Sequence, residues 1–352
     1  MKKKFLSLFL AGAMLLTAGL AGCAKKQDSK KIGVAMPTKD LQRWNQDGDN
    51  MKKKLEAAGF TVDLQYAGND IPTQQNQIES MINGGCKVLV IASIEGDSLG
   101  TVLATAKEKN IPVIAYDRLI MNTDAVAYYA TFDNYKVGQI QGQYIIDQLK
   151  LESTDGPYNL EIFTGDPGDN NARFFYNGAM DLLKPYIGTK LIVKSGQVDF
   201  EQVATQDWAT ANAQARMDAI ISGNYADGTK LDAVLCSNDS TALGVANALE
   251  AGYTGDYPII TGQDCDIANV KNMINGKQSM SVFKDTRSLA DQVVEMVKAI
   301  MEGKDAPTND TTTYNNGVKV VPSYLCTPVF ADADNYKSIL VDSGYYTEAQ
   351  LA

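Results

Sequence analysis

The sequence predicts an α/β protein built from two similar lobes, each with a doubly wound parallel sheet. Short apolar runs rich in β-branched residues alternate with longer stretches of helical periodicity, which is the pattern of parallel strands connected by helices. This alternation begins at Lys31, continues to Tyr116 and restarts after Gly156-Pro157. The length of 352 residues is also sufficient for two domains of ordinary size.

The first lobe is expected to begin with a strand at 32–36 and a helix on which Trp44, Met51 and Leu55 recur at helical spacing. Gly59 follows the last turn of this helix, which is a common helix end. The apolar run KVLVIA is typical of a buried parallel strand. The remaining expected elements are strands at 61–67, 87–92 and 111–116 and helices around Ile78 to Ile82 and at 103–109.

The second lobe repeats the same rhythm, and the last helix has the pattern of a return to the first lobe. The expected strands are 160–163, 191–198, 233–236, 258–261 and 280–283, and the expected helices are 173–183, 211–221, 242–250 and 288–301. A last strand is expected at 311–321, followed by closing elements up to Ala352.

The N-terminus has the features of an export signal. Lys2, Lys3 and Lys4 precede an apolar run at 5–20, which is too short to favour a permanent transmembrane helix. The quartet Leu20-Ala21-Gly22-Cys23 resembles a bacterial lipobox, in which cleavage leaves a lipid on the new N-terminal Cys23. We therefore expect a signal peptide at 1–22 and a polar, lipidated tether at 23–30, with two acyl chains giving stable anchoring.

Composition excludes several functions. The chain contains no histidine, so Ser-His-Asp catalysis, Cys-His catalysis and His-ligated zinc are excluded. The formal charge of −10 argues against a nucleic-acid partner. No glycine-rich phosphate loop is present. Gly96-Asp97-Ser98-Leu99-Gly100 fits G-x-S-x-G, but without a histidine base we interpret it as a turn leading into a helix.

Four cysteines follow the predicted tether, and none forms a C-x-x-C pair: Cys86, Cys236, Cys265 and Cys326. Cys236 and Cys265 both follow short apolar strands that could be neighbours, and an extracytoplasmic location permits a disulfide. Isolated, buried thiols are the other interpretation, and the sequence leaves both open.

Polar residues gather after the expected strands, where open α/β sheets bind ligands. They are Arg43, Trp44, Asp117, Arg118, Asp169, Asn170, Asn171, Arg173, Asn238, Asp239, Asp264 and Lys284, with Trp208 before a helix of the second lobe. Asp, Asn and Arg can bind adjacent hydroxyls through paired hydrogen bonds, and tryptophan offers a flat face to the C–H side of a pyranose. Because the charged residues can neutralise one another, this inventory favours an uncharged polyol ligand.

Several motifs resemble those of the multiple-monosaccharide-binding proteins of ABC importers, which are related to xylose- and galactose-binding proteins. They include RWNQDGDN, YDRLI, GDPGDNNARFFYNGAM, TGQDCD and VFKDTR, in this order. The resemblance implies a type I periplasmic-binding-protein fold with three hinge crossings and a sugar between the lobes. The first lobe would comprise 31–136 plus 285–322, and the second 137–284 plus 323–352.

The resemblance also implies the ligand contacts. First-lobe contacts would be Arg43, Trp44, Asp117 and Arg118, and second-lobe or hinge contacts would be Asn170, Asn171, Arg173, Trp208, Asn238, Asp264 and Lys284. Arg173 and Asn238 occupy positions that vary within the family, which leaves the sugar preference open. A calcium loop has no counterpart near 149–158, so we expect neither a structural metal nor a cofactor.

We therefore expect a monomeric lipoprotein, anchored outside the cell membrane, that captures an aldose such as galactose, glucose, arabinose or xylose. It would deliver the sugar to an ABC transporter permease and would not be an enzyme. The alternative is a sugar-sensing subunit that presents its closed lobes to a chemotaxis or histidine-kinase partner. A glycosidase using paired carboxylates is a weaker third possibility, because no histidine is available.

Overall fold

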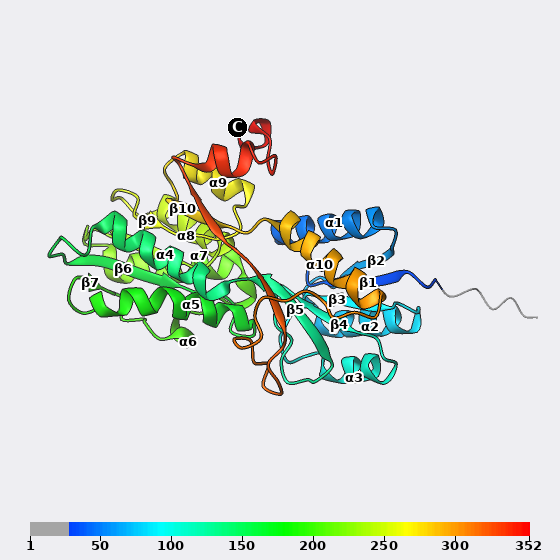
Figure 1. Ribbon diagram of the computed structural model, residues 1–352. Coiled ribbons are helices and arrows are strands. Elements are labelled where there is room, and N and C mark those ends of the chain that lie inside the picture. The colour runs from blue at the N-terminus through cyan, green and yellow to red at the C-terminus, as the bar shows by residue number, and fades with distance from the viewer. Residues whose placement is uncertain (1–27) are drawn as a thin grey trace, which may run out of the picture.

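The computed structural model describes residues 28–352, so the expected signal peptide and the expected lipidation site, Cys23, lie outside the described residues. Two lobes lie side by side, each with a central sheet between layers of helices (Figure 1). Within residues 28–352 no helix is both long enough and apolar enough to cross a membrane.

The first lobe contains a six-stranded sheet in the order β11-β5-β4-β3-β1-β2, and all neighbouring strands are parallel. Its strands are β1 (Lys31–Met36), β2 (Thr61–Tyr66), β3 (Val88–Ile91), β4 (Val113–Tyr116), β5 (Val126–Phe132) and β11 (Ser323–Cys326). Its helices are α1 (Gln42–Ala57), α2 (Ile71–Asn83), α3 (Gly100–Glu108) and α10 (Thr286–Met301). Helices α1 and α10 cover one face through residues such as Met51 and Val293, and α2 and α3 cover the other.

The second lobe contains a parallel sheet in the order β7-β6-β8-β9. Its strands are β6 (Tyr158–Phe163), β7 (Leu191–Ile192), β8 (Ala233–Cys236) and β9 (Ile259–Ile260), and an antiparallel pair is formed by β10 (Met280–Phe283) and β12 (Val329–Asp332). Its α-helices are α4 (Asn134–Leu149), α5 (Asn170–Leu183), α6 (Phe200–Val203), α7 (Thr210–Ile220), α8 (Asp239–Gly252), α9 (Ile267–Ile274) and α11 (Glu348–Leu351). Helices α4 and α5 cover one face of this sheet, and α7 and α8 cover the other.

The chain passes between the lobes three times: from β5 to α4, from β10 to α10 and from β11 to β12. The expected class, two parallel-sheet α/β lobes joined by three crossings, is confirmed. Short apolar strands and amphipathic helices build it because each sheet needs helices on both faces to bury its side chains.

Strand β5 and helix α4 are among the elements that the sequence did not predict, because the second lobe was expected to start only after Gly156-Pro157. Helix α4 has glycines at 138 and 142, which lower intrinsic helix propensity. The structure explains them, since a Cβ on Gly138 would lie 2.0 Å from the Phe175 carbonyl oxygen of α5. The glycines allow α4 and α5 to approach closely, and this contact depends on tertiary structure.

The expected strand at 311–321 is wrong. This segment is a loop in which Asn316 donates from Nδ2 to the carbonyl oxygens of Ile120 and Thr123, 3.1 and 2.7 Å away. Asn side chains of this kind compete with regular strand pairing. The strand that follows, β11, pairs with β5, so Ser323–Cys326 belongs to the first lobe and not to the second as expected. The strand expected at 191–198 is also shorter and ends at Ile192.

Gly96 to Leu99 form a turn before α3, and the Ser98 hydroxyl donates to the Glu95 carbonyl oxygen at 2.9 Å, which confirms the interpretation as a turn. Cys236 and Cys265 are separate thiols, and both are buried. Cys86 is also a buried free thiol, and Cys326 is a half-buried one, so the isolated-thiol interpretation is the correct one.

Candidate functional site

A cavity that is partly open to solvent lies between the lobes, at the carboxyl ends of both sheets. It is lined by Leu41, Arg43, Trp44, Asp117, Arg118, Asp169, Asn171, Phe175, Trp208, Asn238, Ser240, Gln263, Asp264, Asp266 and Lys284. Both tryptophans of the chain are in this set.

The topology explains why these residues meet. Arg43 and Trp44 begin α1 after β1, and Asp117-Arg118 follows β4. From the second lobe, Asn171 begins α5 after β6, and Asn238 caps α8 after β8. Since parallel strands end at the same edge of each sheet, the loops after them converge on the space between the lobes.

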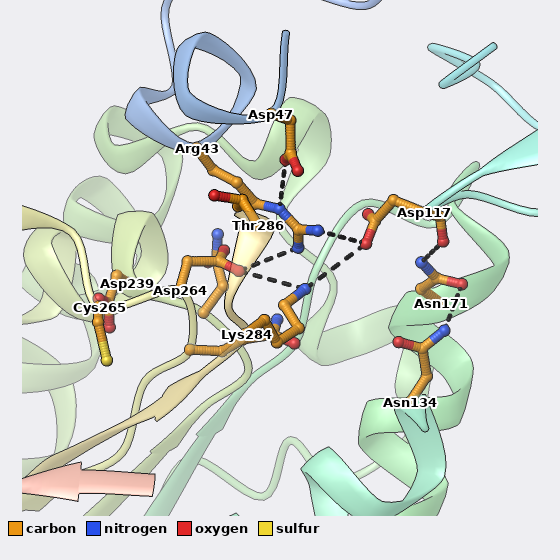
Figure 2. Close-up of polar contacts among 12 residues, drawn as sticks. Arg43, Asp47, Asp117, Asn134, Asn171, Asp239, Asp264, Cys265, Lys284 and Thr286 are labelled. Atoms are coloured by element: carbon orange, nitrogen blue, oxygen red, sulfur yellow. Dashed lines mark hydrogen bonds and ion pairs between the residues drawn. The ribbon is translucent and has the colours of Figure 1, made fainter. Parts of the chain in front are cut away.

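Arg43 is the centre of a buried charge network shown in Figure 2. Its guanidinium lies 2.9 Å from Asp47, 2.5 Å from Asp117 and 3.0 Å from Asp264, which comes from the other lobe. Lys284, at the hinge, lies 3.2 Å from Asp264 and 3.8 Å from Asp117. The site is thus rich in charge, but its charges neutralise one another.

The electrostatics of the first-lobe acids follow from this network. Burial alone would raise the pKa of Asp117, but the charges of Arg43, Lys284 and Arg118 outweigh it and lower the pKa. Asp47 lies deeper, and burial raises its pKa although Arg43 opposes the shift. Asp117 is therefore an ionised acceptor at neutral pH.

Asp117 adopts a left-handed backbone conformation, with φ of 57°, which is uncommon for a non-glycine residue. Its carbonyl oxygen accepts three hydrogen bonds, from Tyr129 Oη at 2.6 Å, Thr131 Oγ1 at 3.0 Å and Asn171 Nδ2 at 2.7 Å. These contacts hold the strained conformation and aim the carboxylate into the cavity. Asp264 and Trp208 are also left-handed, with φ of 98° and 55°.

The aromatic walls come from both lobes. Trp44 and Trp208 are 3% and 5% exposed, and the Arg118 guanidinium lies 5.1 Å from the centre of the Trp44 ring. The Trp208 ring packs against Gly165, where a Cβ would lie 1.9 Å from Cη2 of the indole. Only glycine at this position leaves space for the indole, so Gly165 sets the position of the second wall.

Asp169 contacts two other residues of the cavity wall. Its Oδ2 lies 2.9 Å from Arg118 Nε and accepts a hydrogen bond of 3.2 Å from Trp208 Nε1. Burial raises the pKa of Asp169, and the positive charge of Arg118 acts in the opposite direction. This carboxylate was noted in the sequence as a residue that follows a strand, but it was not among the expected ligand contacts.

Most of the expected contacts line the cavity: Arg43, Trp44, Asp117, Arg118, Asn171, Trp208, Asn238, Asp264 and Lys284. Asn170 and Arg173 do not. Arg173 is exposed, pairs with Glu201 at 2.7 Å and stacks over Phe200. The reason is helical phase, since Asn171 and Phe175 share one face of α5 and a residue two positions from Asn171 points to the opposite side.

The remaining lining residues were not predicted as ligand contacts: Leu41, Asp169, Phe175, Ser240, Gln263 and Asp266. Gln263 Oε1 and Asp266 Oδ1 are buried acceptors for which residues 28–352 supply no donor. Buried acceptors are normally satisfied, so a ligand with hydroxyl groups would complete both. The motif TGQDCD contained these residues, but the sequence alone did not show which of its side chains face the cavity.

The cavity wall combines several hydrogen-bond donors and acceptors with the side chains of both tryptophans. Ser98 makes a turn contact and does not line the cavity, so the G-x-S-x-G segment contributes nothing to it. Within the described part of the chain, no group of three or more Cys, Asp or Glu side chains is arranged to hold a metal ion.

Comparisons with known proteins agree with this geometry. Residues 32–305 match the family model described as "Periplasmic binding protein domain". The multiple sugar-binding periplasmic receptor ChvE of Rhizobium radiobacter is 51% identical over 99% of both chains. The D-xylose-binding periplasmic protein of Escherichia coli is 38% identical over 100% of both.

A solved structure is similar over nearly the whole described chain. It is an ABC transporter solute-binding protein from Clostridium phytofermentans with bound β-D-glucose. Its sequence is 73% identical and its TM-score is 0.91, and the match covers 92% of this chain and 100% of the other. A carbohydrate transporter solute-binding protein from Chloroflexus aurantiacus in complex with D-glucose is 33% identical, with a TM-score of 0.83 and coverage of 91% and 97%.

Proposed function

Because the chain belongs to the periplasmic binding protein family, we propose that it is an extracytoplasmic receptor for a monosaccharide. It captures the sugar between its lobes and delivers it to the permease of an ABC transporter. The names of the similar proteins, which include sugar receptors and glucose-bound transporter subunits, support this assignment. An aldohexose of the glucose type is the first ligand to test.

The observation on which the proposal depends is the cavity between the lobes, which is lined by polar residues and by one tryptophan from each lobe. A pyranose has an apolar C–H face and a rim of hydroxyls, and it needs flat aromatic surfaces above a ring of paired acceptors and donors. An anion or cation would disturb the balance among Arg43, Lys284, Asp117 and Asp264. A neutral sugar leaves that balance intact.

The proposed contacts divide between the lobes. Arg43, Trp44, Asp117 and Arg118 contribute from the first lobe, and Asn171, Trp208, Asn238, Asp264 and Lys284 from the second lobe or hinge. The lobe boundaries proposed here are the crossings after β5, after β10 and after β11. A ligand that touches both sides favours the closed arrangement by its differential affinity.

The protein returns its sugar unchanged and acts as a monomer on the outer side of the membrane. Lipidation of Cys23 holds it there through the polar segment 24–30. In cells, Cys23→Ala should release the protein into the medium or leave its leader uncleaved. A variant that remained with the membrane and was cleaved at the wild-type site would exclude this anchor.

Titration calorimetry of the purified protein against D-glucose, D-galactose, D-xylose and L-arabinose tests the receptor function. We expect at least one of them to bind with micromolar or tighter affinity, and thin-layer chromatography should recover it intact. Absence of binding to the whole panel would refute the proposed ligand class. Recovery of a modified sugar would refute the receptor assignment.

A further inference from the structure

A groove runs along helix α4 of the second lobe, away from the sugar cavity. It is lined by Lys136, Gln139, Ile140, Gln143, Tyr144 and Asp147 of α4, by Leu182 of α5 and by Phe330 of β12. None of these residues lines the cavity between the lobes, and none is a proposed sugar contact. The groove is therefore a second surface of this lobe, which the sugar does not use.

Helix α4 has an apolar strip on its exposed side in addition to the face that it buries. The buried face, which includes Val137 and Ile145, packs in the core of the lobe. The groove residues of α4 recur at intervals of three and four and so share another face. There Ile140 and Tyr144 are half-buried, and the rings of Tyr144 and Phe330 meet edge to face with their centres 5.7 Å apart. Phe330 itself is 36% exposed. Exposed apolar patches with a polar rim are typical of protein interaction sites.

Charges of opposite sign lie at the two ends of this groove. Lys136 is at one end, and Asp147 is at the other, about 16 Å further along the helix at 1.5 Å per residue. Asp332 and Asp334, which follow Phe330 in the chain, lie on the Asp147 side. Burial and the charges of these two acids raise the pKa of Tyr144 to about 12, and Tyr144 is one helical turn from Asp147. The groove is thus basic at one end and acidic at the other.

The acids at this end retain their negative charge toward solvent. Asp147 accepts a hydrogen bond of 2.8 Å from Gln143 Nε2, and Asp332 Oδ1 accepts bonds from the backbone N of Asp334 and Asn335, at 3.0 and 3.1 Å. These donors are neutral, so the contacts do not cancel the charges. Asp147 and Asp334 are exposed. A cationic side chain placed here would be attracted by all three carboxylates, to a degree that depends on salt.

We propose that this groove is a docking surface for the permease, and that it binds an extracytoplasmic segment of the permease in which an apolar side chain is followed by a lysine or arginine. This inference rests on the proposed function, which requires a protein partner. A groove of about 16 Å accommodates about five residues of extended chain at 3.3 Å each. The apolar side chain would contact Tyr144 and Phe330, and the cation would reach Asp147. Three acids against one lysine make an anionic lipid surface an unfavourable occupant.

Two variants test the two parts of the groove, and each has a matched control. Phe330→Ser removes the apolar contact, and its control is Val329→Ser, because Val329 is 43% exposed on the same strand and does not line the groove. Asp147→Lys reverses the charge at the acidic end. Its control is Asp218→Lys, which makes the same change at an exposed position of α7, on the opposite face of the sheet.

Each full-length variant replaces the wild type, at matched amounts of protein, in a strain from which the gene has been deleted. The initial rate of uptake of radiolabelled D-glucose is measured at saturating sugar. Both groove variants should lower this rate about fivefold to thirtyfold, which is the effect of losing one central interface contact. Both controls should keep the wild-type rate. A higher amount of a groove variant should restore part of the uptake, since concentration offsets weaker docking.

Calorimetry separates docking from sugar binding. All four purified variants should bind D-glucose within about threefold of the wild type, which is less than 1 kcal/mol, because none of the four positions lines the sugar cavity. A decrease in uptake that matched a loss of glucose affinity would overturn the docking role, because the change would then act on the sugar cavity.

Wild-type uptake by both groove variants would also overturn the proposal, as would equal decreases in the variants and their controls. The same strains test the proposed function separately. If the wild-type protein restored no uptake, its assignment as a receptor for the permease would fail, and docking to the permease would fail with it. Failure of the docking surface alone leaves wild-type uptake intact and equal to that of the groove variants.

Discussion

Replacing Asp117 with asparagine removes one negative charge from the middle of the cavity while keeping the shape of the side chain. Asp117 lies 2.5 Å from Arg43 and 3.8 Å from Lys284, so both cations lose a partner. Asparagine is preferable to alanine here, because φ at this position is 57° and asparagine tolerates the left-handed region far better.

The expected loss of sugar affinity can be worked from these contacts. A hydrogen bond to a charged group contributes about 1.5–3 kcal/mol, and an ionised carboxylate facing a sugar can accept two. The asparagine amide keeps one acceptor, so we expect a loss of about 2–4 kcal/mol, or roughly a thirtyfold to a thousandfold weaker affinity. The free energy of unfolding should decrease by a smaller amount, about 1–3 kcal/mol at neutral pH, because Arg43 keeps its contacts with Asp47 and Asp264.

Calorimetry with the best-bound sugar measures the effect. Asp124→Asn is the matched control, since Asp124 pairs with Lys107 on the surface, where the two side chains are 56% and 55% exposed. The control should bind sugar as the wild type does. If Asp117→Asn bound sugar within about threefold of the wild type, which is less than 1 kcal/mol, Asp117 would not be a sugar contact and our account of the cavity would be wrong.

Three further predictions concern other parts of the molecule. Gly138→Ala should lower the free energy of unfolding by about 3 kcal/mol in urea denaturation, because its Cβ would meet the α5 backbone; Gly100→Ala, where the space is open, should not. Arg173→Ala should leave sugar affinity unchanged in calorimetry. A tenfold loss of affinity would show that Arg173 contacts the sugar after all. Burial, with a contribution from Asp264, raises the pKa of Asp266 to about 7. The folded state therefore binds the extra proton between about pH 4 and 7, and stability should decrease as pH rises through this window. Asp266→Asn should flatten that decrease in melting temperature, and an unchanged slope would contradict the assignment.

Much of the fold was predictable because it depends on local patterns. The buried runs at β3, β8 and β10 were placed within two residues of their observed ends, since continuous apolar β-rich segments are typical of parallel sheets. Helix α4 was not predictable in this way, because Gly138 and Gly142 weaken the local signal and are explained only by the backbone of α5. Strand β11 was assigned to the wrong lobe, because a short strand does not specify its partner.

For the site, too, local sequence patterns determined some features and tertiary contacts determined others. The sequence by itself determined that polar and aromatic residues follow the strands, and parallel topology brings such positions to one edge. It therefore predicted Asp117-Arg118 and both tryptophans. Only the tertiary structure decided that Asn171 faces the cavity and Arg173 faces solvent, because that choice depends on the rotation of α5 against α4. It also decided that Asp169 lies between Arg118 and Trp208, since these residues belong to different lobes and their distance is set by how far the lobes close.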